Sequence, residues 1–181
     1  MIEVLITLVI LLFALLGLVG LQSRAQLVES DSYQRAQALI LVHDIADRLN
    51  ANRSNAAGYV VAVGSPLGQG STKDCSAPAS LADRDLCAWD AALKGAAEAL
   101  GGACAADGTH CVGAMIGARG CITSPAANQY LIEVVWQGLA KTVAPPASVG
   151  CGANLYPDTT TPDDTVRRAV TTAVTIGTLS P

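Results

Sequence analysis

The stretch IEVLITLVILLFALLGLVGLQ, residues 2–22, decides the fold of this chain. From Val4 to Ser23 there is no charged residue, and a helix of that length spans about 30 Å, the hydrocarbon core of a bilayer. One acid, Glu3, stands just before the run. No basic segment precedes the run and no small-residue cleavage site follows it, so we interpret it as a retained membrane anchor. A cleaved signal peptide and a buried helix of a soluble domain are the weaker alternatives.

The apolar run passes into an amphipathic pattern without a break. Apolar residues recur at three- and four-residue steps from Leu21 to Leu49, and charged residues lie mainly on the other face. We therefore expect one helix from about Ile2 to about Asn52, with residues 1–23 as its transmembrane half and residues 24–56 as its amphipathic half. Gly17 and Gly20 are either a small-residue packing surface or a soft point where the helix bends.

The remaining residues, 57–181, predict a globular head. A connector rich in Gly, Ser and Pro extends to about residue 78, and Ser80 and Asp83 fit the N-cap and first turn of a second helix over residues 81–100. Residues 130–138 and 167–176 alternate like β-strands, and residues 112–123 would add an earlier strand or a short hairpin. The predicted fold class is α+β: a long N-terminal helix packed on an antiparallel sheet of residues 112–176, with the second helix inserted between them.

Six cysteines lie beyond the apolar run. An even number on one side of a membrane anchor favours disulfides in an oxidising compartment, either the periplasm or the cell exterior. Their spacing contains no CxxC pair, so a zinc site is the weaker interpretation. Spacing does not choose among the possible pairings; the pairs that we favour are Cys75–Cys87, Cys104–Cys111 and Cys121–Cys151.

No catalytic constellation is apparent. The chain has two histidines, His43 and His110, for which we expect surface positions, and it has no nucleophile-elbow motif. The formal net charge of -4 argues against a general nucleic-acid binder. We therefore predict no enzymatic activity, no cofactor, no metal site and no nucleic-acid partner.

Charged residues near the C-terminus have structural interpretations. An arginine pair, Arg167 and Arg168, opens the last predicted strand and would hold a loop carboxylate or contact a partner. The acids before it lack EF-hand spacing and are expected to mark turns rather than bind calcium; they are Asp158, Asp163 and Asp164.

Several stretches together carry a resemblance to a known family. IEVL, residues 2–5, opens the apolar run with an acid near its start, and LLGLVGLQ, residues 15–22, lacks a proline. Further matching stretches are DIADRLNANRSNAAGY (residues 44–59), CAWDAAL (87–93), YLIEVVWQG (130–138) and RRAVTTAVTI (167–176). With these features the chain resembles the type IV pilins, and among them the minor pilins called PilV, or type IV pilus modification protein.

The resemblance implies the pilin fold and a structural role. Such a subunit primes pilus assembly, packs by its N-terminal helix, and presents a disulfide-bonded head to other minor pilins, the major pilin or a tip adhesin. It would first be a single-pass inner-membrane protein with its head in the periplasm, and then part of an extracellular pilus that serves adhesion and twitching motility. Glu3 would select the axial register by pairing with the α-amine of a neighbouring subunit.

The start of the chain departs from the family pattern. Family members begin with a short basic leader that a prepilin peptidase removes before the new N-terminus is methylated. No such leader is present in this sequence, and Glu3 stands third rather than fifth. Either the chain is processed unusually or, as we expect, the peptidase acts on a full-length precursor that starts earlier.

Two other functions remain open. A pseudopilin of a type II secretion system would use the same helix to move exported proteins. A membrane-anchored periplasmic binding module would have no role in a filament.

Overall fold

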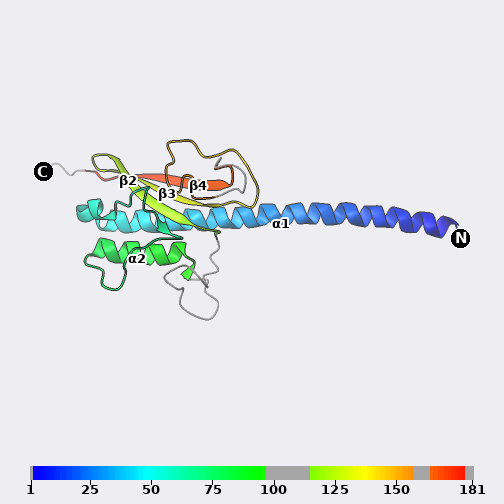
Figure 1. The fold of residues 1–181 in the computed structure, drawn as a ribbon, viewed down its shortest axis with the longest axis horizontal. Coiled ribbons are helices and arrows are strands. Elements are labelled where there is room, and N and C mark those ends of the chain that lie inside the picture. Colours follow the sequence, from blue (N-terminus) through cyan, green and yellow to red (C-terminus); the bar gives the residue numbers. More distant parts are fainter. Residues whose placement is uncertain (1, 97–114, 157–163, 178–181) are drawn as a thin grey trace. The chain divides into compact units, whose positions relative to one another are not determined.

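A computed structural model describes residues 2–96, 115–156 and 164–177 of the chain (Figure 1). Its first element is the helix α1, Ile2–Ala51, which agrees with the expected helix from about Ile2 to about Asn52, although its amphipathic half ends at Ala51 and not at residue 56. The chain divides into two compact units, Met1–Tyr33 and Gln34–Pro181, and the division falls within α1.

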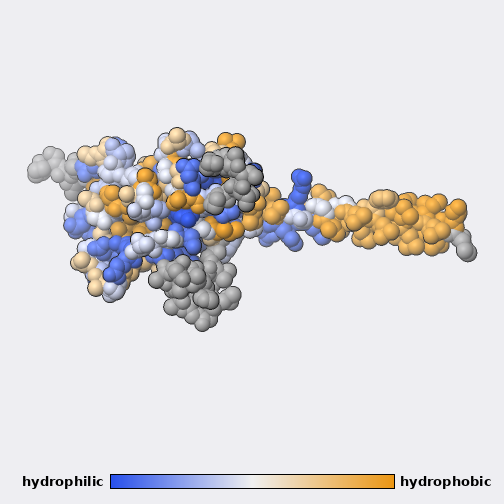
Figure 2. Space-filling view, viewed as in Figure 1, coloured by the Kyte–Doolittle hydropathy of each residue, from blue (hydrophilic) through white to orange (hydrophobic). Residues whose placement is uncertain are grey.

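The first unit is helical throughout its described residues. Every side chain from Ile2 to Glu29 is exposed, although most residues as far as Leu21 are large and apolar. Figure 2 colours the leading, apolar part of α1 almost entirely as hydrophobic. By length and composition, α1 is the one helix among the described residues that could cross a membrane.

The second unit contains a four-stranded antiparallel sheet. Its strands lie in the order β1-β2-β3-β4, with bounds Leu67–Gly68, Arg119–Ala126, Gln129–Gln137 and Arg167–Thr175. A bulge interrupts the β2–β3 register between Thr123 and Ala126, and Asn128 turns the chain with a positive φ of 58°. This sheet and the long helix place the chain in the α+β class.

The core forms where the amphipathic part of α1 meets the sheet and the second helix, α2, Leu81–Leu93. From α1 it takes side chains at three- and four-residue steps, which is the buried stripe of a surface helix: Ala38, Val42, Ile45 and Leu49. From the sheet and α2 it takes aromatic and branched side chains, chiefly Ile122, Ile132, Val134, Trp136, Leu86 and Trp89. A 3₁₀ helix, η1, Arg53–Tyr59, follows α1 and adds Tyr59.

The second helix begins as expected but is shorter than expected. The Ser80 hydroxyl accepts a hydrogen bond from the Asp83 backbone N–H at 3.0 Å, which is an N-cap. The helix ends at Leu93, not at Leu100, because Gly95 takes a left-handed φ of 84° and its N–H returns to the Ala92 carbonyl. Residues 97–100 lie outside the described residues.

The sheet also departs from its predicted bounds of 112–176. The described part of the first predicted strand begins at Arg119, because Gly117 turns the chain with a φ of 61°, and it continues to Ala126. The connector that leads to α2 contains the two-residue strand β1, and Val61 forms an isolated bridge with Ile122.

The strand β3 is buried on both faces. One of the two faces that the alternation separates, which includes Ile132 and Val134, lies in the core. On the opposite face, Glu133 and Val135 are equally buried, and Val135 packs in a smaller cluster with the disulfide cysteines Cys121 and Cys151. The segment that follows β3 therefore covers the outer face of the sheet.

Candidate functional site

The exposed apolar face of α1 is the candidate assembly site. Glu3 lies in the first turn of the helix and is exposed; a carboxylate there interacts favourably with the partial positive charge of a helix N-terminus. The next charged residue along the chain is Arg24. Phe13 is 71% exposed and Leu16 is 66% exposed. A continuous apolar surface of this kind binds lipid or other apolar helices.

Gly17 and Gly20 lie within this face. The helix runs through both positions, and a Cβ added at either would meet no atom within 4 Å. No contact within the described chain therefore requires glycine at these positions. Their use for close packing or for bending stays a prediction.

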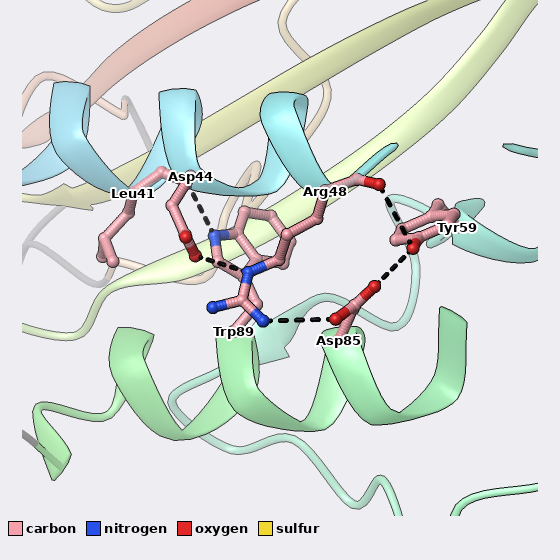
Figure 3. Close-up of polar contacts among 6 residues, drawn as sticks. All are labelled: Leu41, Asp44, Arg48, Tyr59, Asp85 and Trp89. Atoms are coloured by element: carbon pink, nitrogen blue, oxygen red, sulfur yellow. Dashed lines mark hydrogen bonds and ion pairs between the residues drawn. The ribbon is translucent and has the colours of Figure 1, made fainter. Parts of the chain in front are cut away.

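A polar network fastens α2 to the later part of α1 (Figure 3). The indole N–H of Trp89 donates to the Leu41 carbonyl at 3.0 Å, although Trp89 is otherwise fully enclosed by the core. A Cβ added at Gly120, on β2, would overlap the Trp89 ring. The indole is thus held between the helix α1 and the strand β2.

The second part of this network joins three elements through one carboxylate. Arg48 donates to Asp44 at 3.0 Å and to Asp85 at 3.2 Å, and the hydroxyl of the buried Tyr59 donates a hydrogen bond to Asp85 (Figure 3). Burial, and then the hydrogen bond to Asp85, raise the pKa of Tyr59. Burial opposes the charge of Arg48, but the two carboxylates more than offset this and raise its pKa. Asp85 therefore links α2 to both α1 and η1.

Another cluster fixes the segment after β3 to the outer face of the sheet. The buried Glu133 carboxylate accepts a hydrogen bond from the Cys151 N–H at 2.8 Å. Arg167, also buried, donates to the Val149 and Cys151 carbonyls, each at 3.0 Å, and pairs with Asp164 at 2.9 Å. Arg167, the first arginine of the predicted pair, therefore holds a loop carboxylate, that of Asp164.

Tyr156 holds the end of the same segment against the sheet. Its hydroxyl donates to the Gly117 carbonyl at 2.7 Å and lies 3.1 Å from the Val135 carbonyl, and the Arg119 guanidinium lies 4.7 Å from its ring centroid. Burial raises the pKa of Tyr156 to about 12, against the opposing effect of Arg119. The phenol is therefore held in its neutral form.

Two of the favoured cysteine pairs lie at disulfide separation. The Cα atoms are 5.7 Å apart for Cys75–Cys87 and 5.8 Å apart for Cys121–Cys151, within the usual range of disulfides. The first ties the connector to α2, and the second ties β2 to the segment after β3. The pair Cys104–Cys111 lies outside the described residues.

The remaining candidates from the sequence are the two histidines and the acids near the C-terminus. His43 is exposed, and its Nδ1 lies 2.7 Å from the Leu39 carbonyl. Among the described residues no group of His, Cys, Asp or Glu is arranged to hold a metal ion. Residues outside the described ranges are His110, Asp158 and Asp163.

Sequence reasoning missed the residues that lock the head together. Glu133 lies on the face of β3 opposite the core, where an acid is ordinarily exposed to solvent. The sequence of the strand therefore gives no signal that Glu133 is buried. In the sequence of α2, Asp85 falls on the polar side of the helix, so the pattern does not indicate its contacts with α1 and η1. The aromatic partners, Trp89 and Tyr59, were detectable only as core residues.

Comparison with known proteins adds one finding to this geometry. Residues 20–92 match the Tt1218-like family, described as Type IV pilin Tt1218. This segment is similar to a type IV pilin. It covers the latter part of α1, η1, β1 and most of α2, so it contains the whole network of Figure 3. No curated protein and no solved structure gives a significant match to the chain.

The rest of the structure is consistent with this similarity. A long N-terminal helix combined with a four-stranded antiparallel sheet is a pilin-like architecture. The family to which this segment is similar is structural rather than enzymatic. An apolar N-terminal helix is compatible with membrane anchoring and with a place in a pilus.

Proposed function

We propose that this protein is a minor pilin of the PilV kind, a structural and priming subunit of a type IV pilus. It waits in the inner membrane with its head in the periplasm, and it enters the filament by exchanging lipid contacts for contacts with the helices of other subunits. Its head meets other minor pilins, the major pilin or a tip adhesin.

The exposed apolar surface of residues 4–21 is the observation that carries this proposal. Each large apolar side chain left in water forgoes about 1.5–3 kcal/mol relative to full burial, so such a run is not stable in water. Lipid covers this apolar surface before assembly, and the helices of neighbouring subunits cover it afterwards. Helices in this environment associate by close packing rather than by the hydrophobic effect, which suits Gly17 and Gly20 on the same segment.

Glu3 gives the exchange a preferred alignment. In a bundle of apolar helices the carboxylate has little water, and an α-amine of a neighbouring subunit is a suitable cation. A buried pair that loses one partner costs about 3–5 kcal/mol, whereas the intact pair is close to neutral. This asymmetry penalises slipped registers and favours one position of each subunit.

The two cysteine pairs at disulfide separation support a head built to function outside the cytoplasm. Both join segments that lack regular structure to a helix or strand: Cys75 to α2, and Cys151 to β2. We infer that they form during export and hold the head in one conformation while it binds other subunits.

The proposal is tested by placing Glu3→Val in the chromosomal copy and measuring the protein in membranes and in sheared pili. We expect normal amounts in the membrane and at least a tenfold loss from the pili. Glu29→Gln removes a charge from the same helix beyond the apolar run and serves as the matched control, which should enter pili normally.

Normal recovery of the Glu3→Val protein from sheared pili would refute the register role. A deletion strain separates the wider alternatives. Loss of piliation or twitching supports a pilus subunit, while lost export of secreted proteins with normal pili would assign the chain to a secretion system instead.

A further inference from the structure

The two edges of the sheet differ in how far they are covered. At the first edge the connector pairs with β2: the Val61 N–H donates to the Ile122 carbonyl at 2.8 Å, and the Ile122 N–H donates back at 3.0 Å. The short strand β1 pairs with β2 at two further positions. The other edge is formed by β4, which pairs with β3 along its whole length.

Register shows which backbone groups of β4 face away from β3. The Gly138 N–H donates to the Val166 carbonyl at 2.7 Å, and this pair continues the β3–β4 register at one end. The Ile176 N–H donates to the Asn128 carbonyl at 2.8 Å and continues it at the other end. Because alternate residues of an antiparallel strand face the neighbour, even-numbered residues of β4 face β3. Four odd-numbered residues therefore direct their N–H and C=O groups outward: Ala169, Thr171, Ala173 and Thr175.

This outer edge is open within the part of the chain that the structure describes. None of the four outward-facing residues makes a backbone hydrogen bond on that side within residues 2–96, 115–156 and 164–177. Residues 169–177 contain no charge and no proline. Soluble proteins ordinarily protect an edge strand with such residues, so this edge is suited to pairing with another extended chain.

A groove accompanies the first half of the edge. It has a volume of about 370 Å³ and an apolar wall formed by Val143, Pro145, Pro146 and Val149. Its other side is β4, from Arg167 to Thr171. Val143 is 90% exposed. A strand added beside β4 would direct alternate side chains over this wall, because directly opposed residues share one face of a sheet.

At the groove end of the edge stands a positive charge that no carboxylate of the described residues neutralises. Arg168 donates to two carbonyls, of Ala140 at 2.6 Å and of Thr165 at 3.1 Å, and it forms no ion pair with a carboxylate of the described residues. Arg167, in contrast, is paired with Asp164. An incoming chain with a carboxylate at this end would therefore meet a complementary charge.

We propose that β4 binds an extended segment of a different protein, which adds to the sheet as a further antiparallel strand. The segment is uncharged and β-branched along Ala169–Thr175, places apolar side chains over the groove, and ends in an acidic residue beside Arg168. A second copy of β4 fits this edge less well. Paired antiparallel it would bring no aspartate or glutamate of residues 169–177 to Arg168, and paired parallel it would bring the two arginine ends together.

The proposal concerns the head alone and does not rest on filament assembly, so the two can fail separately. The probe is a fluorescent synthetic peptide in which threonine and valine alternate, with a C-terminal glutamate, titrated against the full chain in detergent micelles. In the proposed pairing the valines lie on the groove face, and their N–H groups face β4. N-methylation of the valines should weaken binding at least tenfold, and N-methylation of the threonines should leave it unchanged.

Two further readouts complete the experiment. Saturating peptide should slow hydrogen exchange at Thr171 and Ala173, whose N–H groups face outward, and replacing its glutamate with lysine should weaken binding. Ala173→Pro removes one outward N–H without touching the β3 ladder and should also abolish binding. If that variant unfolds, the pair of N-methylated peptides still decides.

Equal binding of the two N-methylated peptides, or unchanged exchange at Thr171 and Ala173, would overturn the proposal. Slowed exchange at these residues without peptide, growing with protein concentration, would also overturn it, because the occupant would then be a second copy.

Discussion

Replacing Asp85 with alanine should loosen the joint between α1, η1 and α2. The change removes the acceptor of the Tyr59 hydroxyl and one partner of Arg48. A hydrogen bond to a charged group contributes about 1.5–3 kcal/mol. The Arg48 side chain is 37% exposed and that of Asp85 is 14% exposed, so the ion pair adds less than about 1 kcal/mol after solvent screening. We expect a total loss of about 2–4 kcal/mol in the free energy of unfolding.

Urea unfolding of the detergent-solubilised chain measures this loss. The chain has 2 tryptophans, and both, Trp89 and Trp136, are buried in the core of the second unit. Their fluorescence therefore reports the same unit that contains Asp85. Asp47→Ala removes an exposed acid from α1 and is the control, expected to change stability by no more than about 0.5 kcal/mol.

A double-mutant cycle tests the reasoning directly. Tyr59→Phe removes only the hydroxyl, so its effect and that of Asp85→Ala should overlap by about 1–3 kcal/mol in the double variant. If the two effects simply add to within about 0.5 kcal/mol, the carboxylate does not hold the tyrosine, and our account of the joint is wrong.

Two further predictions concern the segment that covers the outer face of the sheet. First, Tyr156 ionises at a pKa of about 12 in the folded chain and at about 10 when unfolded. Its contribution is complete below pH 10 and is lost as the pH rises towards 12, by about 2–3 kcal/mol in all. Tyr156→Phe should therefore be less stable than the wild type at pH 8 but lose less stability between pH 10 and 12; parallel pH profiles in urea unfolding would contradict this. Second, Cys121→Ser with Cys151→Ser opens a loop with a sequence separation of 30 and should cost about 3–4 kcal/mol. In the wild type, dithiothreitol should likewise make residues 75–151 sensitive to protease before α1 is cut. Unchanged protease resistance of that region after reduction would count against the disulfides.

The elements with a strong local signal were predictable from sequence. The uncharged run before Arg24 and the apolar stripe that ends at Leu49 define α1 almost to the residue, because the helical period persists without a proline. Ser80 and Asp83 mark the start of α2, since an N-cap is a local hydrogen bond between residues three apart. The inner face of β3 follows from the alternation of its side chains.

Features that depend on contacts between distant segments were not predictable. The burial of Glu133 arises from a hydrogen bond to Cys151, which alternation along one strand cannot show. The strand β1 is two residues long and exists only because β2 lies beside it. The end of α2 had a local signal in Gly95, but the alanine-rich residues that follow continue a helical pattern and suggested a longer helix.

The central claim is that the leading part of α1 exchanges lipid for the helices of other subunits. The most direct measurement places a photoreactive benzoyl-phenylalanine at Phe13 and irradiates both the membranes and the sheared pili. We predict lipid adducts in the membrane fraction and crosslinks to the N-terminal helices of other pilins in the fibre. Lipid adducts alone in intact pili, or the absence of the protein from the pili, would contradict the account.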